Sequence, residues 1–293
     1  MSGPGSTVLA IGASGRFAGL IVPELARRGV RVRAFLRDAG KADAARANGA
    51  VEIAIGDLRD PESVRAAMEA VEGVFYIGPA FAEEETAFGL RAVAAAEGSG
   101  VRRFVFSSVM HPAVPLAHHG AKLPVEAALQ GSRLAYTILQ PAMFFQNFAP
   151  DWPRIIGGGR FGAPYSKGAR IGLVDYRDVA EVAAIALTED GLGCGSFELC
   201  GEPALDRHAI AQIISEVSGV PIEAAEQTPG QWLETTTPRA TDRVKKLLAD
   251  MFAYYDLHGF AGNSLALGAI LGREPRRLRA YIGELESRRR QAA

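Results

Sequence analysis

The chain has 293 residues and a mass of 31.1 kDa, with 48% hydrophobic residues, 22% charged residues, 33 glycines and 16 prolines. These are ordinary values for a globular protein, so they argue against a disordered chain, a collagen-like repeat and a disulfide scaffold. The 32 basic and 33 acidic residues nearly cancel, which leaves no electrostatic footprint for nucleic acid.

Metal binding and membrane insertion are not indicated by the sequence. The two cysteines, Cys194 and Cys200, lack a zinc-binding pattern, and we expect both to be buried thiols. The N-terminal residues carry no basic or long apolar segment, and no apolar run approaches the ~18 residues of a membrane span. We therefore expect a cytoplasmic protein that binds no metal, no membrane and no nucleic acid.

Short apolar runs alternate with helical patterns through the first half of the chain. Residues 7–11 form the first predicted strand, a glycine turn follows, and apolar residues recur at helical spacing from Phe17 to Leu25, where Pro23 should kink the helix. Further strands are predicted at 30–36, 51–55, 74–77, 104–107 and 136–139, and helices at 41–47, 61–71, 83–97 and 125–129. This alternation predicts an α/β fold, a doubly wound parallel sheet of the Rossmann-like type, whose ligand crevice lies at the carboxyl ends of its strands.

The second half of the chain, beyond Pro150, is less regular. Glycine-rich segments at 157–159 and 162–164 flank a predicted hairpin, a strand is predicted at 196–200, and helices are predicted at 178–187, 206–217, 241–255 and 274–285. We expect residues 1–150 to form a dinucleotide-binding domain and residues 151–293 a smaller α+β domain that defines the substrate. The arginine-rich last helix is predicted to present a solvated face.

The turn after the first predicted strand carries a glycine pattern. The segment Gly12, Ala13, Ser14, Gly15, Arg16, Phe17 and Ala18 reads G-x-x-G-x-x-A and leads directly into the predicted helix. Small residues there let backbone amides and the positive helix end approach a pyrophosphate. The pattern predicts a dinucleotide site, and a purely steric turn is the alternative.

The end of the second predicted strand bears on the choice of nicotinamide cofactor. It reads Phe35, Leu36, Arg37, Asp38, so position 36 holds no acid for the ribose hydroxyls of NAD. Arg37, with help from Arg16 and Lys41, could instead accommodate the 2′-phosphate of NADP. We expect NADPH to be preferred over NADH. The alternatives are that Arg37 is a solvated strand-end charge and that Asp38 serves the ribose in an NAD enzyme.

Several motifs resemble the NmrA-like group of atypical short-chain dehydrogenases/reductases. They are the glycine turn, residues 32–38, 56–58, 61–67, 73–75, 100–108 and 136–141, and later the runs 197–201 and 271–276. The resemblance implies that Asp57 and Leu58 border the adenine and that Gly78 and Pro79 cover the ribose and pyrophosphate. It also implies a cofactor contact for Ser107. A simple turn at Gly78 and Pro79 is the alternative.

The wider reductase family uses Tyr-x-x-x-Lys, in which the phenol moves a proton and the lysine holds the nicotinamide ribose. The equivalent spacing here reads His118, His119, Gly120, Ala121, Lys122, so the tyrosine is absent and the lysine remains. The resemblance implies that Lys122 contacts the cofactor, and we expect His118 to replace the tyrosine as proton donor. A solvated lysine and an ordinary loop histidine are the alternatives.

Residues after the fifth and sixth predicted strands are candidates for substrate contact. His111 follows the fifth strand, and Phe144, Phe145 and Asn147 follow the sixth. We expect them to line a pocket for a flat substrate. The phenylalanines could equally join the two domains.

These observations predict an NADPH-dependent oxidoreductase that transfers a hydride to a small quinone, carbonyl or conjugated acceptor. The alternative is a non-catalytic NAD(P)-sensing regulator that acts through a protein partner, since the tyrosine is absent. Lys122 and the nearby histidines favour the enzyme. A homodimer is compatible with either function.

Overall fold

The computed structural model describes residues 5–292 and divides the chain into two compact units. The first unit comprises the chain up to Pro141 together with Tyr176–Glu198, and the second comprises Ala142–Asp175 together with the chain from Leu199 onward. The sequence predicts one boundary after residue 150, whereas a helix and a strand from the second half return to the first unit. The roles expected for the two domains remain predictions. Residues 1–4, part of the N-terminal segment expected to carry no targeting signal, lie outside the described residues.

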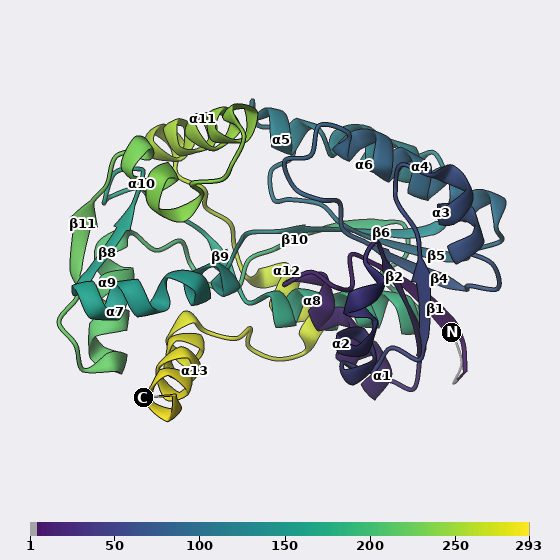
Figure 1. Ribbon diagram of the computed structural model, residues 1–293, viewed down its shortest axis with the longest axis horizontal. Helices are drawn as coiled ribbons and strands as arrows, with labels where there is room; N and C mark the ends of the chain where they lie inside the picture. Colours follow the sequence, from purple (N-terminus) through teal and green to yellow (C-terminus); the bar gives the residue numbers. More distant parts are fainter. Residues whose placement is uncertain (1–4, 293) are drawn as a thin grey trace. The chain divides into compact units, whose positions relative to one another are not determined.

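The first unit is built on a seven-stranded sheet with the order β10-β6-β5-β4-β1-β2-β3 (Figure 1). Its strands are β1 (Thr7–Ile11), β2 (Arg31–Leu36), β3 (Glu52–Ile55), β4 (Gly73–Tyr76), β5 (Arg103–Ser107), β6 (Ala135–Pro141) and β10 (Gly195–Leu199). Neighbouring strands from β3 across to β6 pair in parallel. The doubly wound sheet and its six strands from the first half are therefore confirmed.

Helices cover both faces of this sheet. They are α1 (Ile21–Arg27), α2 (Ala42–Ala47), α3 (Pro61–Ala67), α4 (Glu85–Gly98), α5 (Ala117–Gly120), α6 (Leu123–Gln130) and α8 (Tyr176–Thr188), with the short 3₁₀ helices η1 (Ala18–Leu20) and η2 (Ala39–Lys41). Helices α3, α4 and α6 lie on one face, and α1 and α8 lie on the other (Figure 1). The core under the first group includes Leu9, Phe35, Tyr76, Phe104 and Ile138, none more than 5% exposed.

Local sequence signals account for where two helices begin. The Asp60 side chain accepts a hydrogen bond from the Glu62 amide at 3.0 Å, and Pro61 occupies the first position of α3, as the sequence predicts. Pro23 does not interrupt a helix as expected, because η1 precedes α1 and places Pro23 in the first turn of α1. The first amides of a helix have no acceptor within the helix, so a proline in the first turn removes no helical hydrogen bond.

Two elements of the second half belong to the first unit, which the sequence assigns to the smaller domain. Helix α8 packs against α1 and strands β4, β5 and β6, and β10 extends the sheet beside β6. The Cys194 amide donates to the Tyr136 carbonyl at 2.6 Å at the start of this edge pairing. The apolar stripe of α8 supplies the cover that β4 to β6 need on that face, because a parallel sheet is buried on both sides.

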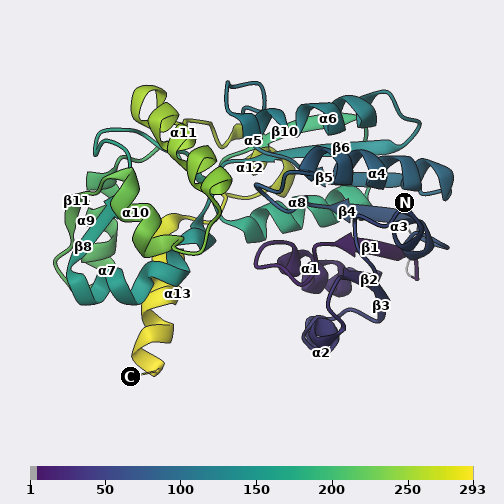
Figure 2. The ribbon, with the colours of Figure 1, turned by 45° about the horizontal axis from the view of Figure 1, so that its top comes forward.

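The second unit contains short strands and more helices. They are β7 (Met143–Phe144), η3 (Phe145–Asp151), α7 (Trp152–Gly158), β8 (Arg160–Ala163), β9 (Leu173–Val174), α9 (Arg207–Ser218), β11 (Glu223–Glu226), α10 (Pro229–Thr236), α11 (Asp242–His258), α12 (Leu265–Leu271) and α13 (Leu278–Gln291). Figure 2 shows α9 beside β8 and β11. No helix within residues 5–292 is long and apolar enough to cross a membrane.

The prediction of a hairpin near residue 160 is wrong. Residues 152–158 form α7, and Gly159 takes the left-handed conformation, with φ +61°, that ends this helix. Strand β8 then pairs in parallel with β11, and β7 pairs in parallel with β9. The glycines therefore terminate a helix rather than turn a hairpin.

The cysteines differ in their surroundings. Cys200 is buried, and its thiol donates to the Glu202 carbonyl at 3.1 Å. Cys194 is exposed, contrary to expectation, because it lies with φ +58° in the turn before β10. In the described part of the chain no group of three or more His, Cys, Asp or Glu residues is placed to hold a metal ion.

The last helix has the solvated charged face expected of it. Arg288 and Arg290 of α13 have side chains 63% and 61% exposed, and they pair with Glu284 and Glu286 of the same helix. The opposite face is buried in the core of the second unit, where Ile282 is fully covered. The arginines are thus partly neutralised within the helix itself.

We predict that Gly89→Ala destabilises the protein. A Cβ at Gly89 of α4 would lie 2.4 Å from Val125 Cγ2 of α6, and overpacking of this kind costs about 1–3 kcal/mol, more than the roughly 1 kcal/mol that alanine gains over glycine in a helix. Gly98→Ala, in the last turn of α4 with no atom within 4 Å of its Cβ, is the matched control and should be neutral or slightly stabilising. Urea unfolding of both variants checks this, and equal stabilities would contradict the close approach of α4 and α6.

Candidate functional site

The glycine turn between β1 and η1 has the tight geometry that its sequence predicts. Gly12 adopts φ +89°, and its carbonyl accepts a hydrogen bond from the Gly15 amide at 2.8 Å. A Cβ at Gly12 would lie 3.0 Å from Ile77 Cγ2, and one at Gly15 would lie 3.1 Å from the Gly12 carbonyl oxygen. Ala13 is buried and Ser14 is exposed. Only glycine therefore allows this backbone path beside β4.

Cationic side chains without a carboxylate partner lie at the carboxyl ends of β1 and β2, although the Arg16 guanidinium lies 5.9 Å from the centre of the Phe17 ring. Arg16 is in the glycine turn, Arg37 directly follows β2, and Lys41 ends η2. All three are exposed, and none forms a hydrogen bond or an ion pair with another residue of the described range 5–292. Strands β1 and β2 are adjacent and parallel, with Ile11 opposite Phe35, so these loops share one edge of the sheet.

Asp38 has a local structural task. Its carboxylate caps η2 by accepting a hydrogen bond from the Gly40 amide at 2.9 Å. A ribose contact from Asp38 would have to share this carboxylate, whereas Arg37 is uncommitted. The local geometry thus favours Arg37 as the residue that selects the cofactor.

The residues expected beside the adenine follow β3. Asp57 is half-buried, and its carboxylate accepts from the Arg59 amide at 2.8 Å. The Leu58 side chain packs on the core of the first unit, and its carbonyl accepts a hydrogen bond from Arg91. Only the backbone and part of the side chain of Leu58 are therefore available to contact a ligand.

Gly78 and Pro79 follow β4. A Cβ at Gly78 would lie 3.2 Å from Tyr76 Oη and 3.4 Å from Glu85 Cγ, so the chain passes close over these side chains. Pro79 is exposed, and its carbonyl accepts from the Ala82 amide at 3.1 Å. The segment is therefore a turn without large side chains at the carboxyl edge of the sheet.

Ser107, the last residue of β5, is tied to the glycine turn through a buried tyrosine. Tyr176 Oη donates to Ser107 Oγ at 2.9 Å, and the Tyr176 ring lies 5.4 Å from the Phe17 ring. Burial raises the pKa of the Tyr176 phenol far above its usual range, so the phenol keeps its proton. The contact fixes Phe17 against the end of β5.

Lys122 is held by two oxygen atoms. Its Nζ donates to Glu85 Oε1 at 2.6 Å and to the backbone carbonyl of His118 at 3.0 Å. The segment is not one continuous helix, because α5 ends at Gly120 and α6 begins at Leu123. The spacing of four residues therefore brings Lys122 to the carbonyl of His118, not to its imidazole.

The histidines beside Lys122 form an aromatic cluster. The His118 ring lies 5.0 Å from the Phe81 ring and 4.7 Å from the His119 ring. His119 is 1% exposed, and burial lowers its pKa to about 4, so its ring is neutral at neutral pH. His118 and His111 are partly exposed. Both ring nitrogens of His118 are nevertheless buried, so a proton-donating role for His118 stays a prediction.

Two residues of this cluster have a strained backbone. Phe81 has φ +64° and His111 has φ +52°, in a region that L-residues with bulky side chains rarely adopt. His111 Nε2 lies 3.4 Å from Glu198 Oε1, and the His111 carbonyl lies 3.2 Å from His119 Nδ1. Such strain of about 1–3 kcal/mol persists where the surroundings hold it, and it is concentrated at functional sites.

The substrate candidates after β6 belong to the second unit. Phe144 lies in β7 and is half-buried, and Asn147 is exposed. Phe145 is fully buried and contacts Tyr281 at a ring distance of 5.8 Å, so it is part of the core and not of a pocket wall. Buried Gln146 donates to buried Asp175 at 2.7 Å. Substrate contact by Phe144 and Asn147 remains a prediction.

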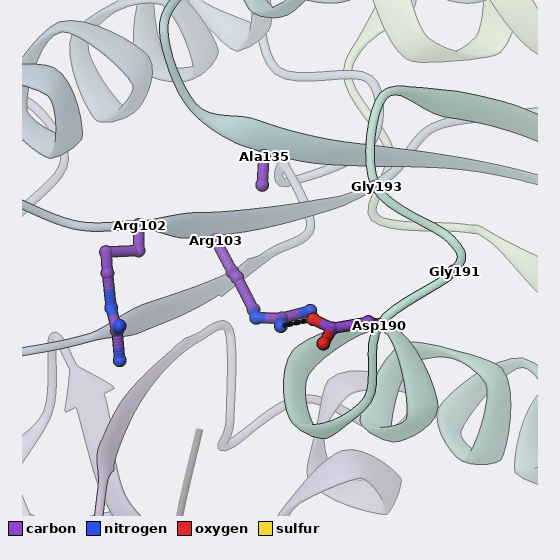
Figure 3. A pocket seen from close by; sticks show the side chains of 6 residues that line it. All are labelled: Arg102, Arg103, Ala135, Asp190, Gly191 and Gly193. Carbon is purple, nitrogen blue, oxygen red and sulfur yellow. Dashed lines mark hydrogen bonds and ion pairs between the residues drawn. The ribbon is translucent and has the colours of Figure 1, made fainter. Parts of the chain in front are cut away.

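A cavity of about 200 Å³ lies at the opposite edge of the sheet, at the start of β5 and β6 (Figure 3). Arg103 donates there to the carbonyls of Ala186 and Glu189, and it pairs with Asp190. This pairing lowers the pKa of the Asp190 carboxyl. The charges of this cavity are already neutralised, so we do not assign the function to it.

Glu85, Tyr176 and Glu126 are site residues that the sequence analysis missed. Buried Glu126 accepts hydrogen bonds from Ser108 and, at 3.0 Å, from Gln140, which ties α6 to the ends of β5 and β6. The sequence does contain a pattern that indicates burial of Glu85. Phe88, Gly89 and Ala92 follow it by three, four and seven residues, which places Glu85 on the apolar stripe of α4. A carboxylate on a buried stripe requires a partner.

Comparisons with known proteins agree with this geometry. An NAD(P)H azoreductase of Xenophilus azovorans is 30% identical over 217 residues, which cover 73% of this chain and 75% of that protein. The NADPH-dependent quinone oxidoreductase QOR2 of Escherichia coli, solved with NADPH, superposes with a TM-score of 0.83 at 21% identity, covering 95% of this chain and 99% of that one. NmrA, a negative transcriptional regulator solved with NAD, gives 0.80 at 16% identity, covering 99% and 98%.

The sheet order and the glycine turn define a doubly wound protein of the Rossmann-like class. The model of the NmrA-like family matches residues 4–283. The chain therefore belongs to the NmrA-like family, and the resemblance found in its sequence motifs is confirmed.

We predict that Gly12→Ala abolishes dinucleotide binding. The substitution forces an L-residue into φ +89° and places a methyl group 3.0 Å from Ile77 Cγ2, so the turn must shift. Gly29→Ala, with φ +74° and nothing within 4 Å of its Cβ, is the control for backbone strain alone. Both variants should lose stability in thermal unfolding, and only Gly12→Ala should fail to bind NADPH in a titration. Normal binding by Gly12→Ala would show that the phosphates lie elsewhere.

Proposed function

We propose that the protein is an NADPH-dependent reductase of small, flat, conjugated acceptors such as quinones. The observation that carries the proposal is the group of three cations without an ion pair, Arg16, Arg37 and Lys41, beside a turn whose two glycine positions are too crowded for an unstrained side chain. A phosphorylated dinucleotide would match both features. Membership of the NmrA-like family supports the same cofactor class.

The described residues fit such a cofactor. Gly12 and Gly15 would let the pyrophosphate approach the backbone, and Arg37 would meet the 2′-phosphate, with Arg16 and Lys41 adding positive charge. Lys122 would donate a hydrogen bond to a ribose hydroxyl. When bound, the cofactor supplies the hydride, and the protein binds, orients and provides the proton.

The acceptor class is supported by the side chains after β4 and β5. Phe81, His111 and His118 are all partly exposed there, and two of them form a contact between rings. Aromatic side chains bind flat π-systems in offset or tilted geometry. Relatives named as an azoreductase and a quinone oxidoreductase are consistent with an acceptor of this shape.

The function is tested by NADPH consumption with a panel of quinones, azo dyes, aldehydes and enones, measured beside direct titration of NADPH. We expect turnover of at least one flat conjugated acceptor. Tight NADPH binding without turnover of any acceptor would overturn the proposal in favour of a cofactor-sensing regulator. Absence of binding would exclude both.

We predict that Arg37→Ala weakens NADPH binding and leaves NADH binding unchanged. Loss of a charge-assisted contact to the 2′-phosphate should cost roughly 1.5–3 kcal/mol, which corresponds to about ten- to a hundred-fold in Kd. Arg133→Ala, which removes an exposed arginine before β6 at the opposite edge of the sheet, is the control. Titration of each variant with both cofactors checks this, and equal affinity of the unmodified protein for NADPH and NADH would contradict it.

We predict that Lys122→Ala and His118→Phe impair turnover in different ways. Lys122→Ala should weaken NADPH binding and lower kcat, because it removes the ammonium that meets the ribose. His118→Phe keeps the backbone carbonyl that holds Lys122 and keeps a ring beside Phe81, so cofactor affinity should be unchanged while kcat falls by about 10² to 10⁴. Steady-state kinetics with NADPH titration separate the two. Undiminished kcat in His118→Phe would place the proton source elsewhere.

A further inference from the structure

The ion pair between Lys122 and Glu85 is almost completely buried. The two side chains are only 12% and 7% exposed, and Nζ lies 2.6 Å from Oε1. Removing two charges from water is costly, and a buried pair is often no more stabilising than apolar side chains of the same size. The need for stability therefore does not explain why this carboxylate lies on the apolar stripe of α4.

The pair restricts what the Lys122 ammonium can bind. An ammonium group has three N–H donors, and two are used, by Glu85 Oε1 and by the His118 carbonyl oxygen. With two acceptors fixed, the direction of the third donor is also fixed, because the three N–H bonds are tetrahedrally arranged. One donor thus remains for a ligand, in a single orientation.

The position of Glu85 is itself fixed by helix packing. Next to it, Thr86 Oγ1 donates to the Ala121 carbonyl at 2.7 Å, beside Lys122. One turn further along α4, Gly89 meets Val125 of α6 so closely that no Cβ fits between them. Glu85 is therefore carried on a backbone that is locked to the segment bearing Lys122, so the ion pair does not depend on a flexible side chain alone.

We propose that Glu85 is a positioning residue, which holds the Lys122 ammonium so that its one remaining N–H meets a ribose hydroxyl of the dinucleotide. The inference rests on the proposed function for the role of Lys122. Glu85 keeps the lysine side chain oriented before the ligand arrives, which lowers the entropic cost of binding. The other titratable groups around the pair are Tyr76 on β4 and His118 and His119 on α5.

Cofactor binding and turnover give the first test. Glu85→Gln keeps the shape and removes the charge, and Glu85→Asp keeps the charge on a shorter arm. Glu83→Gln makes the same chemical change at an exposed site two residues before α4. We expect Glu85→Gln to weaken NADPH binding by about ten-fold, the scale of one charge-assisted hydrogen bond, with Glu85→Asp intermediate and Glu83→Gln unchanged. Wild-type affinity in both Glu85 variants would overturn the proposal.

The second test needs neither cofactor nor substrate. The chain has only five lysines, so the ¹³Cε-lysine NMR spectrum is simple, and Lys122→Arg assigns the Lys122 signal by its disappearance. We expect the Lys122 signal to change its chemical shift and to report a more mobile side chain in Glu85→Gln than in the unmodified protein, because the ammonium loses the carboxylate that holds it. Unchanged shift and mobility would overturn the proposal.

The two tests separate this inference from the proposed function. If the unmodified protein does not bind NADPH, the proposed function fails, while the lysine spectrum still reports whether Glu85 holds Lys122 in place. If NADPH binds and turnover occurs but the Glu85 variants match the unmodified protein, the positioning role fails alone. Should Glu85→Gln not fold, as judged by circular dichroism, Glu85→Asp answers both measurements.

Discussion

The candidate site depends on the parallel register of one sheet. Ile11 at the end of β1 stands opposite Phe35 of β2 and Tyr76 of β4, and Tyr76 stands opposite Phe106 of β5. Because parallel strands all end at the same edge, the first residues beyond each strand converge although they are far apart in sequence. Gly12, Arg37, Ile77 and Ser108 occupy those positions, and Gly78 follows Ile77. The residues just beyond the strand ends therefore form the candidate site. The helices contribute chiefly by holding these strand ends in place.

Several features at the carboxyl edge of the sheet lower the local stability of the protein. Phe81 and His111 adopt left-handed backbone conformations, and Glu85 and Lys122 remove two charges from water. The close packing of α4 on α6 and the Tyr176 hydrogen bond to Ser107 supply compensating contacts around these features. The strained and buried polar groups lie after β4 and β5, whereas the cations without an ion pair lie after β1 and β2. The first region is built for fixed orientation of small groups, and the second for attraction of a charged one.

The sequence predicts local features well and distant pairings poorly. The strands of the first unit, the glycine turn and the Asp60 cap follow from residues that are neighbours in the chain, so their patterns are complete in the sequence. The assignments of α8 and β10 to the smaller domain failed because their order along the chain does not tell which apolar surface they cover. The predicted hairpin failed for a related reason, since a glycine can end a helix as well as turn a strand. Glu85 was missed because its partner Lys122 comes from another helix.

Because the usual tyrosine is absent, the proposed reduction needs another group as proton donor. The Lys122 ammonium is already engaged in a buried ion pair with the Glu85 carboxylate. His119 is neutral because burial lowers its pKa to about 4, and its Nδ1 lies beside the His111 carbonyl. Tyr176 keeps its proton on the hydrogen bond to Ser107. Among the titratable groups next to Lys122, His118 is not the side-chain partner of the ion pair, and its two ring nitrogens are buried. Under the proposed function, Lys122 with Glu85 would keep the orienting role of the usual tyrosine and lysine. The proton would come from a separate group, for which we propose His118, whose backbone carbonyl helps to hold the lysine.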